Sequence, residues 1–300
     1  MNLQTLLNSK QAGKLALFLS RSIPPSVGYR LARIVAARIA ASPQTPMVQA
    51  IRANQWVVSG GNLSPSQLDE AVLECLGYVT RSFFEFFHYL NRPARLEDLV
   101  DFNPQALEIF HRTQRAERGA VLCGVHTTSG DLLVRVAGLK GAQMTGLSLP
   151  IANEAIEWQH NIRRQVGLEI LPATQGNIRQ LIHRLEAGET VFTGVDHPAP
   201  DLRYHPVFFG RPAQLPTHHI FLALKARVPI VVMVSMLDQD GRYHICSSDY
   251  IEMTPHADRE KEMIQNAEVI LQAAEALIRL APRQWAVFQP VWPQVLKEVP

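Results

Sequence analysis

The sequence predicts an α/β fold, with a central mostly parallel or mixed sheet flanked by helices and an all-helical N-terminal portion. From residue 3 to about residue 90, apolar residues recur only at the spacing of helices. From Gly119 onward, short apolar runs alternate with amphipathic stretches, which is typical of strands that exchange with helices in a layered fold. We therefore expect a helical region over residues 1–95 and one continuous α/β core over residues 96–300.

Prolines divide the N-terminal region into separate helices. Pro24-Pro25 and the stretch from Pro43 to Pro46 interrupt the helical periodicity, because proline lacks the backbone N–H that a helix interior needs. Ser64-Pro65 has the order of an N-cap residue followed by a first-turn proline, so a helix is expected to begin there.

The elements of the core follow from the alternation after Gly119. Short apolar runs mark the strands, and longer amphipathic stretches mark the helices. The expected strands are 120–125, 144–149, 169–171, 190–195, 230–237 and 243–246. The expected helices are 131–137, 154–165, 177–186, 217–226 and 260–280.

The composition is that of an ordinary globular protein. Of the 300 residues, 47% are hydrophobic and 19% are charged, which excludes disordered and collagen-like classes. The formal net charge of +2 gives no net field that would draw the chain to nucleic acid. The longest charge-free stretch, residues 53–68, is polar and shorter than the ~20 apolar residues of a membrane span, so no transmembrane helix is expected.

The cysteines and the N-terminus bear on the compartment. Cys75, Cys123 and Cys246 are widely spaced, so the sequence predicts neither a disulfide framework nor a zinc knuckle. A reducing compartment fits this pattern. The first residues lack a clean apolar run and a small-residue cleavage site, so secretion through a signal peptide is not expected.

One amphipathic stretch, residues 27–41, bears on location. Three arginines share a broad sector of this helix, and apolar side chains occupy the opposite side. Such a helix suits an anionic bilayer surface, where each cation near the headgroups contributes ~1 kcal/mol. It also suits a surface helix that packs on the protein's own core. The side chains concerned are Arg30, Arg33 and Arg38 on one side and Val27, Leu31, Ile34 and Val35 on the other.

The main candidate for chemistry is the end of the first core strand, which runs into His126. A buried strand that delivers a histidine into a loop before a helix places the imidazole at the carboxyl edge of the sheet, where open α/β folds bind ligands. We expect the Asp131 carboxylate to fold back onto one imidazole nitrogen, which leaves the other nitrogen as a base. The alternative is that Asp131 only completes a helix capping box with Thr128.

Together with further segments in the same order, these residues make the chain resemble the bacterial lipid A lauroyl/myristoyl acyltransferase family. That family includes the phosphatidylinositol mannoside acyltransferases and lies within the lysophospholipid acyltransferase group. Its signature is a histidine, four residues and an acidic residue, matched by His126 and Asp131. The later matches are Asn153 with Arg163, Arg164 and Gly167; the helix end 185–189; the strand 191–195 running into Asp196; the segment 207–213; Thr217 through Val231; and the ending 281–285.

The chain also departs from the family pattern. His197 and Pro198 follow Asp196, where the family has a polar residue and then Asp or Gly. His218 and His219 follow Thr217, where a glycine is usual. Gram-negative members usually begin with a membrane-spanning helix, which is not expected here. These differences concern the acceptor rather than the fold.

The resemblance implies transfer of a fatty acyl group from a thioester, on acyl carrier protein or coenzyme A, to a hydroxyl of a membrane lipid or glycolipid. No bound cofactor is implied. His126 would take the hydroxyl proton and Asp131 would stabilise the imidazolium, a positioned-base effect of ~10²–10⁴-fold. Backbone N–H groups at the start of the Asp131 helix, or Arg163 or Arg164, would stabilise the oxyanion. The implied location is the cytoplasmic face of the cell membrane, where the N-terminal helical region contacts the membrane surface peripherally.

The expected substrate-binding residues each have a structural alternative. The two arginines suit a helix surface as well as a phosphate. Asp196 suits a turn cap as well as support for the histidine or contact with the acceptor, and the Phe-Phe-Gly segment suits packing as well as the wall of an acyl groove. The residues are Asn153, Arg163, Arg164, Asp196, Phe208, Phe209, Gly210 and Thr217.

Two other function classes use the same residues. A metal-dependent hydrolase would bind zinc or manganese through His126, Asp131, Asp196 and His197, although no HExxH or HxHxD spacing is present. A non-catalytic lipid-binding or carrier protein would keep the His–Asp pair as structure only. Stoichiometric metal would favour the first class, and lipid uptake without thioester turnover would favour the second.

Overall fold

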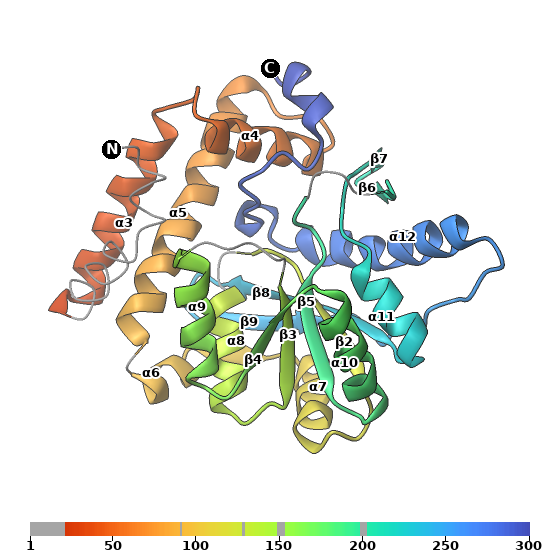
Figure 1. Ribbon diagram of the computed structural model, residues 1–300. Helices are drawn as coiled ribbons and strands as arrows, with labels where there is room; N and C mark the ends of the chain where they lie inside the picture. Colours follow the sequence, from red (N-terminus) through yellow and green to blue (C-terminus); the bar gives the residue numbers. More distant parts are fainter. Residues whose placement is uncertain (1–21, 91, 128–129, 149–153, 199–202) are drawn as a thin grey trace.

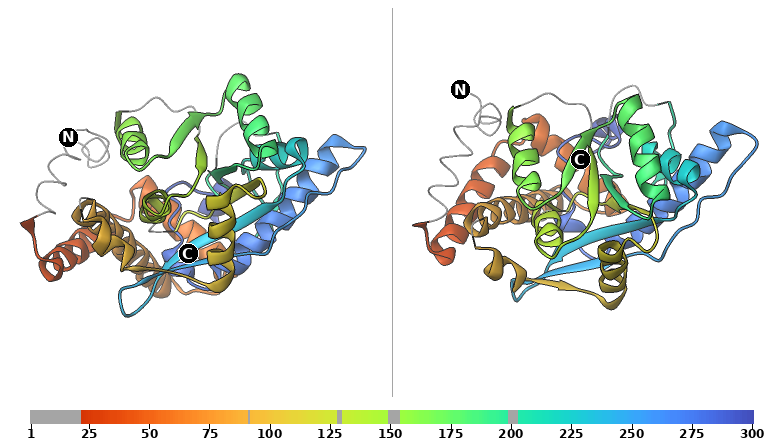
Figure 2. Two further views of the ribbon diagram at one scale, coloured as in Figure 1. Left: turned by 90° about the horizontal axis from the view of Figure 1, so that it is seen from below. Right: turned by 60° about the horizontal axis from the view of Figure 1, so that its bottom comes forward.

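The computed structural model describes residues 22–90, 92–127, 130–148, 154–198 and 203–300. A seven-stranded sheet forms the centre of this part of the chain, with helices on both of its faces and a group of N-terminal helices along one side (Figure 1). Figure 2 places these N-terminal helices and α12 at opposite ends of the molecule. The predicted α/β class with a helical N-terminal portion is confirmed.

The central sheet is mixed but mostly parallel. Its strand order is β1-β9-β8-β2-β5-β3-β4, and every neighbouring pair is parallel except β8 with β9. A separate two-stranded hairpin is formed by β6 and β7. The strands are β1 Val100–Phe102, β2 Ala120–Gly124, β3 Met144–Ser148, β4 Glu169–Pro172, β5 Thr190–Gly194, β6 Val207–Phe208, β7 Arg211–Pro212, β8 Ile230–Leu237 and β9 Tyr243–Ser247.

Helix starts follow the proline and capping signals. The helices α3, α4, α5 and α7 each begin at a proline, which is tolerated there because the first N–H of a helix has no intrahelical partner. Ser64 caps α5 as predicted: the Gln67 N–H donates to its hydroxyl at 3.3 Å, and the Gln67 side chain accepts from the Ser64 N–H at 2.8 Å. The helices are α3 Pro25–Ala40, α4 Pro46–Val58, α5 Pro65–Tyr89, α6 Pro93–Glu97, α7 Pro104–Arg115, α8 Gly130–Leu139, α9 Glu154–Arg164, α10 Gln175–Glu186, α11 His218–Ala226 and α12 Arg259–Ile278, with short 3-10 helices at Pro282–Gln284 and Pro293–Lys297.

The two faces of the sheet bury different helices, because successive strand residues point to opposite sides. Val121 and Cys123 of β2 lie in a core with side chains of α10, α11 and α12. Leu122, between them, lies in a second core with side chains of α5, α6, α7, α8 and α9. Strand ends therefore emerge between two helical layers, at an edge where loops from several elements meet.

The helix α3 packs on α5 through small residues. Gly28, Ala32 and Ala36 form its buried stripe, and a Cβ at Gly28 would lie only 2.0 Å from an atom of the Phe84 ring. The larger apolar side chains stay exposed, from 43% at Val27 to 65% at Ile34. The predicted apolar face is therefore not packed against the described core, and its three arginines are exposed as well. None of the described helices combines the length and apolarity that a membrane crossing requires.

Candidate active site

Two neighbouring strands bring a histidine and an aspartate to the same edge of the sheet. β2 and β5 are parallel and paired in register, with Gly124 opposite Gly194. After each strand, a buried valine leads to a polar residue, which is His126 after β2 and Asp196 after β5. The imidazole Nδ1 of His126 lies 2.5 Å from Asp196 Oδ1, and the His126 backbone N–H donates to Asp196 Oδ2 at 2.8 Å. The register itself thus places the carboxylate beside the ring.

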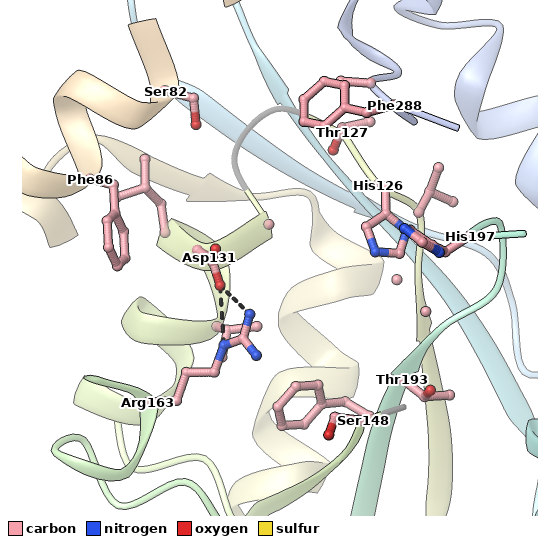
Figure 3. Close-up of a pocket in the computed structure, with 18 of the residues that line it drawn as sticks. Ser82, Phe86, His126, Thr127, Asp131, Ser148, Arg163, Thr193, His197 and Phe288 are labelled. Atoms are coloured by element: carbon pink, nitrogen blue, oxygen red, sulfur yellow. Dashed lines mark hydrogen bonds and ion pairs between the residues drawn. The ribbon is translucent and has the colours of Figure 1, made fainter. Parts of the chain in front are cut away.

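The expected contact between Asp131 and the His126 imidazole is wrong. Asp131, in the first turn of α8, instead accepts hydrogen bonds from the Arg163 guanidinium of α9, from Nε at 3.1 Å and from Nη2 (Figure 3). The physical reason is that α8 presents Asp131 to α9, while Asp196 already occupies the Nδ1 side of the imidazole. The proposed capping partner Thr128 lies outside the described residues.

The C-terminal segment fixes the carboxylate from the other side. The Trp285 indole N–H donates to Asp196 Oδ2 at 2.7 Å, and both side chains are buried. The Ala286 N–H donates to the His126 carbonyl at 2.9 Å, so this segment runs beside the strand end that carries the histidine. From the sequence, residues 281–285 were only part of the family resemblance, and Trp285 had no predicted role. A fully buried carboxylate requires several donors, and this requirement is the signal that was missed.

His126 and Asp196 each stabilise the charged form of the other. Burial by the surrounding walls opposes a charge on the His126 ring, but the Asp196 carboxylate outweighs it, so the pKa of His126 is raised above its usual 6.5. Burial likewise opposes the Asp196 charge, but His126 and the Trp285 N–H outweigh it and hold the pKa of this carboxyl below its usual value. Nδ1 therefore carries the proton that Asp196 accepts, and Nε2 is left as the basic nitrogen.

Gly194 has no side chain, and the His126 imidazole occupies the space where one would lie. A Cβ at this position would lie 2.6 Å from the Cε1 atom of His126, far closer than such atoms approach. The backbone of β5 thus passes directly behind the ring. Any larger residue here would push the imidazole away from its position.

The His126 ring opens into a pocket of about 450 Å³. Its walls are largely apolar and come from α5, from α8 and from the ends of β2, β3 and β5. Figure 3 shows Phe86, Phe288 and Ser148 around this space, with Asp131 and Arg163 together on one side of it and His126 with His197 on another. Although 46% of the His126 side chain is accessible, the surface it exposes faces this pocket.

The remaining predicted residues divide into three groups. Arg163 lines the pocket, whereas Arg164 pairs with Glu157 and Asn161 and does not line it. Thr217 precedes α11 without a capping hydrogen bond and is not part of the wall, although Pro216 and His218 on either side of it are. Asn153 lies outside the described residues.

The Phe-Phe-Gly segment packs behind the site rather than around the pocket. Phe208 is fully buried and stacks on Trp292 with ring centroids 5.6 Å apart, and Phe209 also contacts Trp285. Gly210 has a φ of 72°, which suits a tight turn between β6 and β7. Neither phenylalanine is part of the pocket wall. Their contacts support Trp285 and, through it, Asp196.

The predicted metal ligands do not form a ligand set. Within the described ranges, no group of three or more His, Cys, Asp or Glu side chains is arranged to hold a metal ion. Asp131 is turned to Arg163, and the Asp196 oxygens are taken up by His126 and Trp285. The arrangement is a histidine–aspartate pair beside a largely apolar pocket.

The comparison with protein families agrees with this geometry. A model of the bacterial lipid A biosynthesis acyltransferase family matches residues 12–294. The chain belongs to this family. The protein is therefore an O-acyltransferase of lipid biosynthesis that transfers an acyl group from a donor to a lipid acceptor. Among curated proteins, none matches this acyltransferase.

Proposed function

We propose that the acyltransferase moves a fatty acyl group from a thioester, on acyl carrier protein or coenzyme A, to a hydroxyl of a lipid or glycolipid, with His126 as general base. His126 Nε2 takes the hydroxyl proton while the oxygen bonds to the thioester carbonyl carbon. The carbon–sulfur bond then breaks, and the imidazolium returns the proton to the departing thiolate. The products are an ester and a free thiol, with no acyl-enzyme.

The observation that carries this proposal is the Nδ1–Asp196 contact of 2.5 Å at the wall of an apolar pocket. A neutral hydroxyl is a weak nucleophile, so it needs a base aimed at its proton. Asp196 holds the imidazole in the required tautomer and stabilises the charge that forms on it. Asp196 takes the role expected of Asp131 as the orienting carboxylate.

Asp131 and Arg163 act on the other side of the pocket. The amino end of α8 contributes Gly130, Asp131 and Leu132 to the wall, and a helix N-terminus carries partial positive charge. Arg163 adds a full positive charge, which Asp131 holds in place through two hydrogen bonds. This group supports stabilisation of the oxyanion that develops on the thioester carbonyl.

The apolar walls suit the fatty acyl chain. Phe83, Phe86 and Phe87 of α5 and Leu132 and Val134 of α8 line the pocket. Each buried methylene contributes ~0.8 kcal/mol, so a groove of fixed depth selects for chain length. The helix α5 also packs against α3, where the Phe84 and Tyr29 rings lie 5.7 Å apart.

We place the protein peripherally at the cytoplasmic face of the cell membrane, and the exposed face of α3 supports the membrane contact. Leu31, Ile34 and Val35 are exposed beside Arg30 and Arg33. Apolar side chains that enter the acyl boundary and arginines that meet anionic headgroups are the components of an interfacial helix. Because α3 packs on α5, this face brings the pocket close to the lipid.

The test is acyl transfer by His126→Ala. Purified enzyme is incubated with labelled acyl-CoA or acyl carrier protein thioester and a total bacterial lipid extract, and products are identified by mass. We expect loss of roughly 10²–10⁴-fold in rate, the value of a positioned base, with an unchanged unfolding transition. His183→Ala is the matched control, because its side chain is 81% exposed on α10, outside the pocket wall. Transfer that survives in His126→Ala would refute the assignment of the base.

A further inference from the structure

A second imidazole stands beside the proposed base in the pocket. The His126 and His197 rings have centroids 5.4 Å apart and planes inclined by 58°. Both side chains line the pocket, and Figure 3 shows them next to each other on the same side of it. His197 follows Asp196 directly, so β5 delivers the orienting carboxylate and this second ring in consecutive positions.

The hydrogen bonds define which nitrogen of each ring is available. His126 Nδ1 faces the Asp196 carboxylate, and His197 Nδ1 lies 3.2 Å from the Pro198 carbonyl oxygen. Oxygens of this kind only accept, so each Nδ1 carries the hydrogen. Each Nε2 is then a bare acceptor, and no described residue donates to either of them. Burial and the neighbouring His126 lower the pKa of His197, which keeps its ring neutral and its Nε2 unprotonated.

Other polar groups of the pocket wall are already paired with one another. Arg163 is held by Asp131, and the Thr193 hydroxyl lies 2.8 Å from His218 Nε2. Burial lowers the pKa of His218 to about 4, so this ring is neutral too. The groups beside His197 are therefore neutral, while the Arg163 cation lies with Asp131 on another side of the pocket. Neutral acceptors suit hydroxyl groups better than phosphate.

We propose that His197 Nε2 accepts a hydrogen bond from a second hydroxyl of the acceptor, next to the hydroxyl that His126 deprotonates. The inference rests on the proposed function and names its substrate class: acceptors with neighbouring hydroxyls, as on a sugar or polyol. A hydroxyl has one proton, and the reacting hydroxyl gives it to His126. A second hydroxyl is therefore needed to donate to His197. An acceptor lipid without a second hydroxyl leaves the desolvated His197 Nε2 without a hydrogen bond.

The test compares two acceptors that differ by one hydroxyl. 1-O-Dodecylglycerol has adjacent hydroxyls, whereas 3-dodecyloxy-1-propanol has the same chain and only the terminal one. Both are presented in the same mixed micelles with palmitoyl-CoA, and kcat/KM is measured for wild type, His197→Leu, His197→Gln and the surface control His183→Leu. For wild type we expect a preference for the diol of at least about tenfold, which corresponds to ~1.4 kcal/mol.

The variants distinguish acceptor binding from a structural role. In His197→Leu the diol preference falls to about one, mainly through KM for the diol. His197→Gln, whose side-chain oxygen accepts a hydrogen bond, recovers part of it, and His183→Leu keeps the wild-type ratio. A wild-type ratio near one, or a preference that survives in His197→Leu, would overturn the inference.

Binding separates failure of this inference from failure of the proposed function. If wild type acylates neither probe, equilibrium binding of the two probes below their micellar concentrations replaces the rate. Tighter binding of the diol in wild type but not in His197→Leu supports the inference, and equal binding overturns it. The proposed function fails separately, when wild type turns over no thioester with any acceptor in the total lipid extract.

Discussion

The role of Asp196 is testable by its most conservative change, Asp196→Asn. Two N–H groups, from the His126 backbone and the Trp285 indole, donate to Oδ2 at 2.8 and 2.7 Å, so the amide oxygen of the asparagine is expected to take that position. Its NH₂ group then faces His126 Nδ1. An NH₂ group only donates, so Nδ1 becomes the acceptor and the ring proton moves to Nε2. The nitrogen that faces the pocket is then no longer a base.

The magnitude follows from the interaction that is lost. A hydrogen bond to a charged group is worth ~1.5–3 kcal/mol net, so loss of the ion pair that stabilises the imidazolium costs roughly 10- to 150-fold in rate. The wrong tautomer increases the loss towards the ~10⁴-fold found when this change is made in a serine protease triad. We therefore expect kcat to fall by roughly 10²–10⁴-fold. The fold should persist, because all hydrogen-bond partners of the side chain remain satisfied.

The assay is steady-state acyl transfer with a fixed thioester donor, together with a thermal unfolding scan. Asp131→Asn is the comparison, since it alters the pair with Arg163 on the other side of the pocket and leaves the imidazole partner in place. A value of kcat for Asp196→Asn within tenfold of wild type would refute the argument that this carboxylate sets the tautomer.

The same variant has a characteristic pH profile. In wild type, kcat/KM rises with pH as His126 loses its proton, and the Asp196 carboxylate places this rise above pH 6.5 because it raises the pKa of the ring. Removing the negative charge removes that stabilisation of the imidazolium. In Asp196→Asn the residual activity should therefore begin to rise at a lower pH than in wild type. If kcat/KM of Asp196→Asn began to rise at the same pH as in wild type, an electrostatic role for Asp196 would be contradicted.

Three further changes probe the surroundings of the site. Gly194→Ala should displace the His126 ring, because the new Cβ would lie 2.6 Å from the ring atom Cε1. We expect kcat to fall by roughly 10²-fold with a smaller effect on folding, and unchanged kinetics would argue against this contact. Trp285→Phe removes one donor from the buried carboxylate and should lower the free energy of unfolding by ~1–3 kcal/mol in chemical denaturation, together with kcat. Ile34→Glu should weaken co-sedimentation with anionic vesicles at least several-fold, whereas Val269→Glu, a control at another exposed apolar residue on α12, should not. Equal effects of the two changes would argue against membrane contact through α3.

Most strands and helices of the core were predictable because their signals are local. β2 and β8 are almost continuous apolar runs, and a run of this kind is recognisable without any knowledge of its neighbours. The start of α5 was predictable for the same reason, since Ser64 and Pro65 act within one helical turn. The strands β1, β6 and β7 were not predicted, because two or three residues are too short to show a period. The helix α7 was not predicted either.

The site could be predicted only in part. The position of His126 at a strand end follows from sequence alone, and so does an acidic partner somewhere near it. The sequence contains the parallel patterns Gly124-Val125-His126 and Gly194-Val195-Asp196, but their meaning depends on β2 and β5 being neighbours in register. That pairing joins residues far apart in the chain, and local patterns do not determine it.

By itself, the sequence determined the α/β class, the family resemblance and the histidine at the carboxyl edge of the sheet, because each depends on residues close together along the chain. Only the tertiary structure decided that Asp196 contacts the imidazole, that Asp131 pairs with Arg163, and that the Trp285 indole donates to the buried Asp196 carboxylate. The physical reason is that two side chains interact only when the fold brings them close together in space. Strand register and the path of the C-terminal segment set that distance, and spacing along the chain does not.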